Sequence, residues 1–519
     1  MARKILPNYI KRHGAEFETL ENFIAASTIS DTTAKKLEKT GVPLTRIDET
    51  HYVTSRQELH CFVIGDSGSG KTRRIILPTI HLLAKTGESM VISDPKGELH
   101  RYTASTLKSR GYNVMTLNFR NPEKGNKWNP LGIIEKLYRN GDRTSTDKAT
   151  MLLGDIVSTI ESGIKSERDP YWNMTAASVL RGIIELILMY GKEGSLTFEN
   201  ISNLSRDIFN TFSNTDGVEF RKLKLFINNL PEGSSVARNL APLMTISTAK
   251  TTWGCVLSTL NSMLSLYTSQ QALVDLFSCS EIDIDNIGKK PTALFFILPD
   301  DSDALYPIAT VFVKQVYSAL VNLADAQPDG KLPNRTTFLL DEFANFAKMN
   351  AVDSMLTASR SRGIRFVLVC QSMDQLTEKY GQNGMETLLA NCRTWIYLSC
   401  RNLPFLERLV KLCGEYESPY TGETLPLITV NELQQFKMGK VLVLNDRCRP
   451  MIGYLDRDYS EIDFNEKSKG DDYTDDVMLF VGVKPKSKSG KVLITLNDIL
   501  QTKTDFTDEI NILNNKYDF

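Results

Sequence analysis

Residues 61–72 read CFVIGDSGSGKT, a short apolar run followed at once by a complete G-x-x-x-x-G-K-[ST] motif. A strand that ends in a glycine-rich turn and opens a helix directs backbone N–H groups and the positive helix end at one point, where polyphosphate binds. Lys71 is expected to reach the β- and γ-phosphates of ATP, and Thr72 to bind Mg²⁺. The candidate nucleotide-binding residues are Gly65, Asp66, Ser67, Gly68, Ser69, Gly70, Lys71 and Thr72.

Strands and helices alternate on both sides of this motif. A helical stretch follows it, and further strands are expected at 89–93 and 112–118. Helical periodicity without a clear strand dominates from about residue 130 to residue 285. Buried strands then return at 292–298, 336–341, 364–370 and 393–399. This order predicts an α/β fold with a mostly parallel sheet, interrupted by an all-α domain.

The expected domains follow from these changes of pattern. They are an N-terminal leader at 1–55, a nucleotide-binding domain in two parts at 56–130 and 286–455, an all-α domain at 131–285 and an acidic C-terminal tail at 456–519. Between Asp456 and Asp476, nine Asp or Glu residues stand against three Lys or Arg residues. Such a stretch is typical of a solvated linker, although it could also bind basic cargo.

The composition is that of a globular protein, with 41% hydrophobic residues, 24% charged residues and a formal net charge of −1. Any contact with nucleic acid must therefore come from a local patch or channel. None of the eight cysteines forms a C-x-x-C pair, which argues against a zinc site. No run approaches 18 consecutive apolar residues and no signal peptide is recognisable, so no membrane span is expected.

A pair of acids narrows the reaction. Residues 336–342 read TTFLLDE, an apolar strand that runs into Asp341 and Glu342. In a parallel sheet this end of the strand faces the phosphates, so Asp341 can hold Mg²⁺ through its water shell while Glu342 orients and polarises the attacking water. Together with the phosphate loop, the pair predicts an ATP hydrolase rather than a kinase of small molecules.

A segment rich in arginine, ASRSRGIRFVLVCQS, runs from Ala358 to Ser372. Its buried strand ends at Gln371, which is expected to lie beside the nucleotide and sense the γ-phosphate. An arginine at the edge of the same domain can reach the neighbouring subunit's site and stabilise charge in the transition state. Arg360, Arg362 and Arg365 are the candidates, and a solvated or DNA-facing surface is the alternative interpretation.

The turn SDPKGEL after the second strand carries Asp94, Lys96 and Glu98. These residues could orient Mg²⁺ or a neighbouring subunit. They could equally start a helix, with Asp94 as a cap.

Several segments together resemble the type IV secretion coupling proteins, the conjugative DNA-transfer ATPases of the TraG/TraD family. Besides GDSGSGKT they are SDPKGEL, WNPLG from Trp128, DPYWNMTA from Asp169, LLDEFA from Leu339 and SRSRGIRFVLVCQSMDQL from Ser359. The resemblance covers roughly residues 60–415. The phosphate loop is shared by many families, whereas the DPYW and SRSRGI segments are specific.

This resemblance implies a RecA-like domain interrupted by an all-helical domain, assembled into a ring of six with ATP sites between subunits. Arg360 then corresponds to the arginine finger and Gln371 to the sensor. DNA led by a covalently attached relaxase is handed to the secretion channel, and the helical domain meets the relaxosome. Members usually begin with transmembrane helices, so we expect this chain to work at the cytoplasmic face of a bacterial membrane through a partner. A hexamer is expected for the active state, and a monomer is the alternative for the isolated chain.

Two other functions remain open from the sequence. One is a substrate receptor that docks relaxase or protein effectors, with slow ATP turnover as a switch. The other is a different hexameric ATPase, either the energising ATPase of the secretion channel or a septal DNA pump. The DPYW segment within a large helical insertion favours the coupling proteins.

Overall fold

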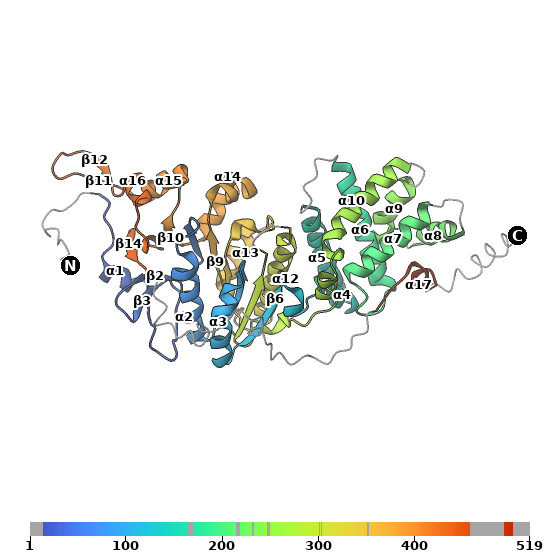
Figure 1. Ribbon diagram of the computed structural model, residues 1–519, viewed down its shortest axis with the longest axis horizontal. Coiled ribbons are helices and arrows are strands. Elements are labelled where there is room, and N and C mark those ends of the chain that lie inside the picture. Colours follow the sequence, from blue (N-terminus) through green and yellow to red (C-terminus); the bar gives the residue numbers. More distant parts are fainter. Residues whose placement is uncertain are drawn as a thin grey trace, which may run out of the picture. The chain divides into compact units, whose positions relative to one another are not determined.

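The computed structural model describes residues 14–162, 170–213, 218–230, 233–246, 250–299, 302, 304–349, 352–456 and 492–501. The chain divides into two compact units (Figure 1). The first unit takes its described residues from Met1–Thr116, Ile284–Asp300 and Val316–Tyr473. The second takes them from Leu117–Asp283, Asp301–Gln315 and Thr474–Phe519.

A nine-stranded sheet forms the centre of the first unit, in the order β14-β13-β10-β4-β9-β8-β5-β7-β6. The strands from β10 to β7 are parallel, and β13 and β14 are added antiparallel at one edge. Their bounds are β4 Cys61–Gly65, β5 Ser89–Asp94, β6 Asn113–Asn118, β7 Thr292–Ile297, β8 Thr336–Leu340, β9 Ile364–Cys370, β10 Thr394–Ser399, β13 Lys440–Leu444 and β14 Met451–Tyr454. The mostly parallel α/β fold expected from the sequence is confirmed.

The central strands are buried along their whole length. Every residue of β4, β5, β7, β8 and β9 is buried, as expected for parallel strands covered on both faces. One face packs in a core with helices α2 (Leu77–Thr86) and α3 (Glu98–Ser109). The unit's other helices are α1 Leu20–Ala25, α13 Val352–Ser359, α14 Met373–Asn391, α15 Leu403–Cys413 and α16 Val430–Gln434, and α12 Tyr306–Asp325 crosses the boundary between the units.

The N-terminal segment contains more regular structure than its sequence indicated. Three short antiparallel strands, β1 Thr28–Asp31, β2 Pro43–Arg46 and β3 His51–Thr54, form their own sheet in the order β1-β3-β2. Val42, Leu44 and Val53 from this segment are fully buried in the core of the first unit. A second small sheet pairs β11 Glu415–Glu417 with β12 Thr424–Pro426.

The second unit is built from helices over most of its described residues. They are α4 Gly132–Arg139, α5 Arg143–Ser162, α6 Pro170–Tyr190, α7 Phe198–Ser213, α8 Val218–Asn228, α9 Ser235–Ile246, α10 Lys250–Thr268, α11 Gln271–Leu276 and α17 Leu496–Gln501. An aromatic cluster holds its core, with Phe198 stacked on Tyr267 at 4.6 Å and Phe277 packed edge-on against Phe198 and Trp128. Trp128 belongs to the WNPLG segment, so that segment has a packing role here.

Two helices are long and apolar enough to cross a membrane by length and composition alone, Tyr171–Tyr190 and Tyr306–Asp325. Polar residues interrupt both helices, so uninterrupted apolar runs in the sequence did not reveal them. In each, 61% of the apolar window is buried inside the structure, as in the core helices of a folded domain.

The acidic stretch lies outside the described residues, apart from Asp456, whose carboxylate pairs with Arg46 at 3.2 Å. Helix α17 lies in the second unit, where Asn200 Nδ2 donates to the carbonyl of Val492 at 2.8 Å. Ile499 is fully buried there.

Candidate functional site

The phosphate loop lies between β4 and a π-type turn at Thr72–Ile76 that leads into α2. Gly68 and Gly70 have φ of +79° and +93°, which only glycine adopts readily. A Cβ on Gly70 would lie 2.8 Å from Arg74 Nε, and one on Gly65 would collide with Ser69 Oγ. The motif's two invariant glycines therefore have steric reasons to be glycine, and the loop has the shape that exposes its N–H groups.

Lys71 is 7% exposed at the base of this loop. Its Nζ donates to the carbonyl oxygens of Gly65 at 2.5 Å and Asp66 at 3.1 Å. Burial lowers the pKa of the ammonium group, whereas the charges of Asp341 and Glu342 raise it. The ammonium group is thus placed in the loop beside the two acids.

One cavity of about 400 Å³ brings the predicted residues together. It is lined by the phosphate loop, the turn after β5 and the ends of β8 and β9. The lining residues are Ser67, Gly68, Gly70, Lys71, Thr72, Arg73, Arg74, Asp94, Pro95, Lys96, Glu98, Leu99, Asp341, Glu342, Gln371 and Met438. All belong to the first unit.

Asp341 follows β8 directly and is 9% exposed. Its Oδ1 accepts a hydrogen bond from the backbone N–H of Glu342 at 3.0 Å, and Ser93 Oγ donates to its carbonyl at 2.8 Å. Burial raises the pKa of this carboxyl to about 7, with a further increase from Glu342 and a smaller one from Asp94, against the lowering effect of Lys71. A buried acid of this kind gains from a nearby cation.

Glu342 has a left-handed backbone, with φ 54° and ψ 42°. A non-glycine residue in this region costs about 1–2 kcal/mol, which the surrounding structure must offset. Both carboxylate oxygens are held: Gln371 Nε2 donates to Oε1 at 2.7 Å and Asn345 Nδ2 to Oε2 at 3.0 Å. The strain and the two donors fix the side chain at the cavity.

Asp94 is the last residue of β5 and is fully buried. Its Oδ2 accepts from the backbone N–H of His100 in the first turn of α3, at 2.8 Å. Burial raises the pKa of the carboxyl to about 6. Asp94 therefore caps the first turn of α3 with its side chain, although Gly97 holds the N-cap position itself, and the same side chain also lines the cavity.

The three arginines lie at or near the N-terminal end of β9, whereas Gln371 follows its C-terminal end. Arg360 and Arg362 form a 3-10 turn before β9, and Arg365 is its second residue. Since β9 is seven residues long, roughly 20 Å of strand separates Arg360 from the cavity of its own chain. Arg360 is exposed, whereas Arg362 Nε pairs with Asp325 at 2.9 Å.

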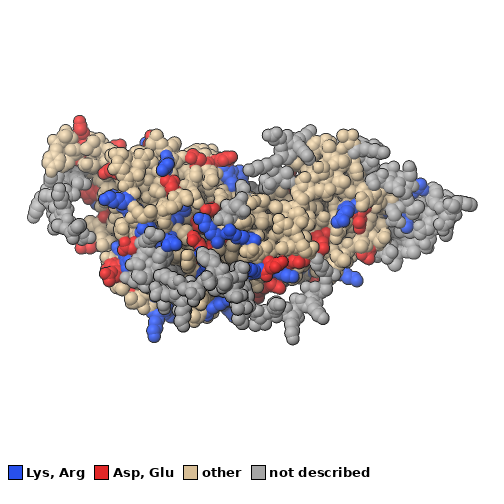
Figure 2. Space-filling model, viewed as in Figure 1, with Lys and Arg blue, Asp and Glu red and all other residues tan. Residues whose placement is uncertain are grey.

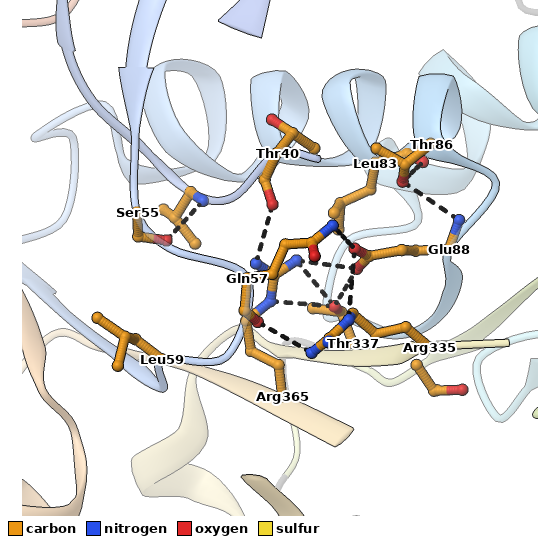
Figure 3. A network of polar contacts seen from close by, with 12 residues as sticks. Thr40, Ser55, Gln57, Leu59, Leu83, Thr86, Glu88, Arg335, Thr337 and Arg365 are labelled. Atoms are coloured by element: carbon orange, nitrogen blue, oxygen red, sulfur yellow. Dashed lines mark hydrogen bonds and ion pairs between the residues drawn. The ribbon is translucent and has the colours of Figure 1, made fainter. Parts of the chain in front are cut away.

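Arg365 is not available to any other site, which corrects its candidacy as a finger. Its side chain is 0% exposed, and its guanidinium is bound by Glu88 Oε2 at 3.1 Å and Thr337 Oγ1 at 3.0 Å (Figure 3). The backbone carbonyl of Thr40 accepts a third contact at 3.4 Å. The network ties the N-terminal segment to the sheet, and a count of charges in the sequence could not reveal it.

His60 links the strand of the phosphate loop to the arginine segment. Its Nδ1 accepts from the N–H of Phe366 at 3.0 Å, so Nε2 carries the proton and donates to the carbonyl of Leu356 at 2.7 Å. Burial lowers the pKa of His60 to about 4. The neutral ring thus supports the segment that precedes Arg360.

Several residues that line the cavity were not predicted from the sequence, Arg74 and Met438 among them. Arg74 is buried behind Gly70, and its guanidinium donates to the carbonyl of Leu455. Met438 lines the cavity with its side chain 58% exposed. The helical position of Arg74, one turn after Gly70, was the only signal in the sequence, and none pointed to Met438.

Basic and acidic side chains are interspersed over the described surface in Figure 2. On that face the coloured residues do not form one continuous basic area among the described residues. This distribution agrees with the net charge of −1.

Residues 15–422 match the protein family described as Type IV secretory system Conjugative DNA transfer. A conjugal transfer protein TraG of Escherichia coli is 26% identical over 429 residues, which cover 78% of this chain and 63% of that protein. Protein VirD4 of Rhizobium radiobacter is 23% identical over 381 residues, or 70% of this chain and 49% of that protein. The chain thus spans between about half and 63% of the length of these two relatives.

Among solved structures, the plasmid coupling protein TrwB in complex with ADP and Mg²⁺ matches with a TM-score of 0.59 at 16% identity, over 86% of this chain and 95% of that chain. TrwB in complex with the non-hydrolysable ATP analogue ADPNP matches with a TM-score of 0.58 at 17% identity, over 86% and 94%. At these identities the comparison supports the fold, a RecA-like P-loop architecture.

Proposed function

The chain belongs to the family of type IV secretory system proteins of conjugative DNA transfer, and we propose that it is an ATP-hydrolysing coupling protein. It recruits relaxase-bound DNA, or protein substrates, and delivers them to a type IV secretion channel. The proposal rests chiefly on the position of Glu342. Its Oε1 accepts a hydrogen bond from Gln371 Nε2 at 2.7 Å, and both residues line the same cavity as the phosphate loop.

The residues of the cavity fit a nucleoside triphosphate with Mg²⁺. Ser69 Oγ is buried in the loop without a hydrogen-bond partner, and Lys71 is held by loop carbonyls that phosphate oxygens can replace. The solved structures of TrwB contain ADP with Mg²⁺ and an ATP analogue, which supports the same ligands here. Thr72 and Asp341 are the residues that would hold the metal.

Each residue has a distinct task in hydrolysis. The phosphate loop and Lys71 bind the β- and γ-phosphates, and Glu342 orients and polarises the attacking water. Gln371 touches Glu342 directly, so it couples occupancy of the γ-phosphate position to the direction of that carboxylate. Mg²⁺, when bound, neutralises charge on the phosphate oxygens.

Arg360 acts in the site of a neighbouring subunit in this proposal. Arg360 is exposed and lies before the N-terminal end of β9, whereas Gln371 follows its C-terminal end, so Arg360 cannot reach its own cavity. Both observations support a role between subunits. A ring of six copies would place each Arg360 at the next copy's nucleotide and would let hydrolysis move DNA. The chain would work at the cytoplasmic face of a bacterial membrane.

Measurement of ATP hydrolysis with and without DNA, in a preparation of known oligomeric state, tests the function. We expect DNA to stimulate hydrolysis and DNA affinity to fall steeply with salt, because phosphate contacts release counterions. A confirmed oligomer with neither DNA binding nor DNA-stimulated hydrolysis would rule out the motor.

A further inference from the structure

Asp94 uses only one of its two carboxylate oxygens inside the protein. Oδ2 accepts from His100 N–H at 2.8 Å, whereas Oδ1 is buried without a hydrogen-bond partner. A carboxylate oxygen that is buried and unpaired is unfavourable, so such an oxygen in a functional cavity points to a missing ligand. The helix cap therefore explains half of this side chain and leaves the other half unexplained.

The sheet places Asp94 beside Asp341. Strands β5 and β8 are parallel neighbours with Ile92 opposite Leu339, and the two acids lie two residues further along each strand. Side chains two residues apart point to the same face, and both Ile92 and Leu339 belong to the core on the face of α2. Both acids also line the cavity of the phosphate loop.

The acids are too few for a metal cage made by the protein alone. Among the described residues, no group of three or more His, Cys, Asp or Glu side chains could hold a metal ion. Mg²⁺ in nucleotide sites keeps several waters and uses one or two carboxylates plus the phosphates of the substrate. A carboxylate beside the residues that hold Mg²⁺ can then accept a hydrogen bond from one of the metal's waters.

We infer that Asp94 is a metal-positioning residue, whose Oδ1 accepts a hydrogen bond from a water in the shell of the Mg²⁺ held at Thr72 and Asp341. This inference rests on the proposed function, because it needs the nucleotide site. It assigns the two oxygens different tasks: Oδ2 fixes the first turn of α3, and Oδ1 orients the metal's water shell. The turn SDPKGEL thereby joins the phosphate loop and the acid pair as a third part of the site.

The decisive variant is Asp94→Asn. The asparagine keeps an oxygen that can accept from His100 N–H but removes the charge, so folding is preserved while the metal contact is weakened. Glu407→Gln is the control, because it removes one carboxylate charge from an exposed position of α15 that does not line the cavity. Circular dichroism and the melting temperature report whether each variant is folded.

The measurement is calorimetric binding of ADP to the full chain, first in EDTA and then at increasing Mg²⁺. For Asp94→Asn we expect unchanged ADP affinity in EDTA and a Mg²⁺ requirement raised about tenfold, as is typical when a partner of the metal's ligands is lost. The wild type and Glu407→Gln should share one Mg²⁺ requirement. Titration with Mn²⁺ in place of Mg²⁺ should show the same separation.

Two results would overturn the inference in different ways. An unchanged Mg²⁺ requirement in a folded Asp94→Asn variant that binds ADP would leave Asp94 as a helix cap only, with the proposed function intact. A wild-type chain that bound no ADP under either condition would defeat the proposed function and this inference together.

Discussion

The buried arginine network gives a prediction whose size follows from the structure. Arg365→Met removes the positive charge that faces Glu88, a side chain only 5% exposed. Breaking a buried ion pair by removing one partner costs about 3–5 kcal/mol. Here Arg335 Nε lies 3.9 Å from Glu88 Oε1 and Gln57 donates to the same oxygen at 3.1 Å, so we expect the lower end, about 3 kcal/mol.

Arg362→Met is the matched control from the same segment. Arg362 pairs with Asp325, and their side chains are 26% and 53% exposed. Such pairs contribute about 0–1 kcal/mol, so this variant should change the stability of the first unit little.

Hydrogen exchange of the amides of β8 and β9 measures this unit without interference from the other. We expect exchange to be roughly 100-fold faster in Arg365→Met, which corresponds to about 3 kcal/mol, and less than about sixfold faster in Arg362→Met. Equal acceleration in both variants would refute the argument from burial. A loss of kcat without a loss of protection in Arg365→Met would restore Arg365 as a finger.

Three further predictions concern the loop, the buried histidine and the exposed arginine. Gly70→Ala should weaken ATP binding by more than about tenfold in a titration, because its Cβ would lie 2.8 Å from Arg74 Nε and its φ is +93°. Gly68→Ala has a φ of +79° but open space around its Cβ, so it should weaken binding only about fivefold; equal losses would contradict this. The pKa of His60 is lowered to about 4 in the folded state, so the stability that its neutral ring contributes is lost as pH falls from about 6.5 toward 4. In urea unfolding, the free energy of unfolding should therefore change by about 2 kcal/mol less between pH 7.5 and 5 in His60→Gln than in the wild type. An identical change in both proteins would exclude His60 as a cause. Arg360→Ala should lower kcat about 10³-fold with nucleotide affinity unchanged. Mixing it with Glu342→Gln subunits should restore some activity, because Arg360 of one subunit serves the site of the next. A kcat like that of the wild type would remove Arg360 from catalysis.

The part of the site that the sequence predicted is the part fixed by the topology of a parallel sheet. Lys71 is far from Asp341 and Gln371 in the sequence. Each of the three nevertheless follows a strand of the parallel sheet, and the carboxyl ends of these strands lie side by side at the cavity. The sequence does not show the order of the strands in the sheet. Ligands of parallel α/β sheets bind at the carboxyl ends of the strands, and this rule holds whatever that order is. The split of the sheet by a helical stretch was visible for the same reason, because the periodicity changes along the chain.

The features that the sequence did not predict have other causes. Arg365 was a candidate finger because its sequence neighbours are charged, and only the fold brings Glu88 to it. The strands at Thr28–Asp31 and Pro43–Arg46 bury polar residues such as Ser30 and Thr45, so their sequences lack the apolar alternation of a typical strand. The two interpretations of Asp94 remained open because they concern different oxygens of one carboxylate.

The most direct test of the central claim compares ATP binding and hydrolysis in the wild type and in Glu342→Gln. We expect the variant to bind ATP with Mg²⁺ as tightly as the wild type, within about twofold. Its kcat should fall by about 10²–10³-fold, because the amide cannot polarise the attacking water. Hydrolysis by the variant at the rate of the wild type would contradict the role of Glu342 and with it the proposed hydrolytic site.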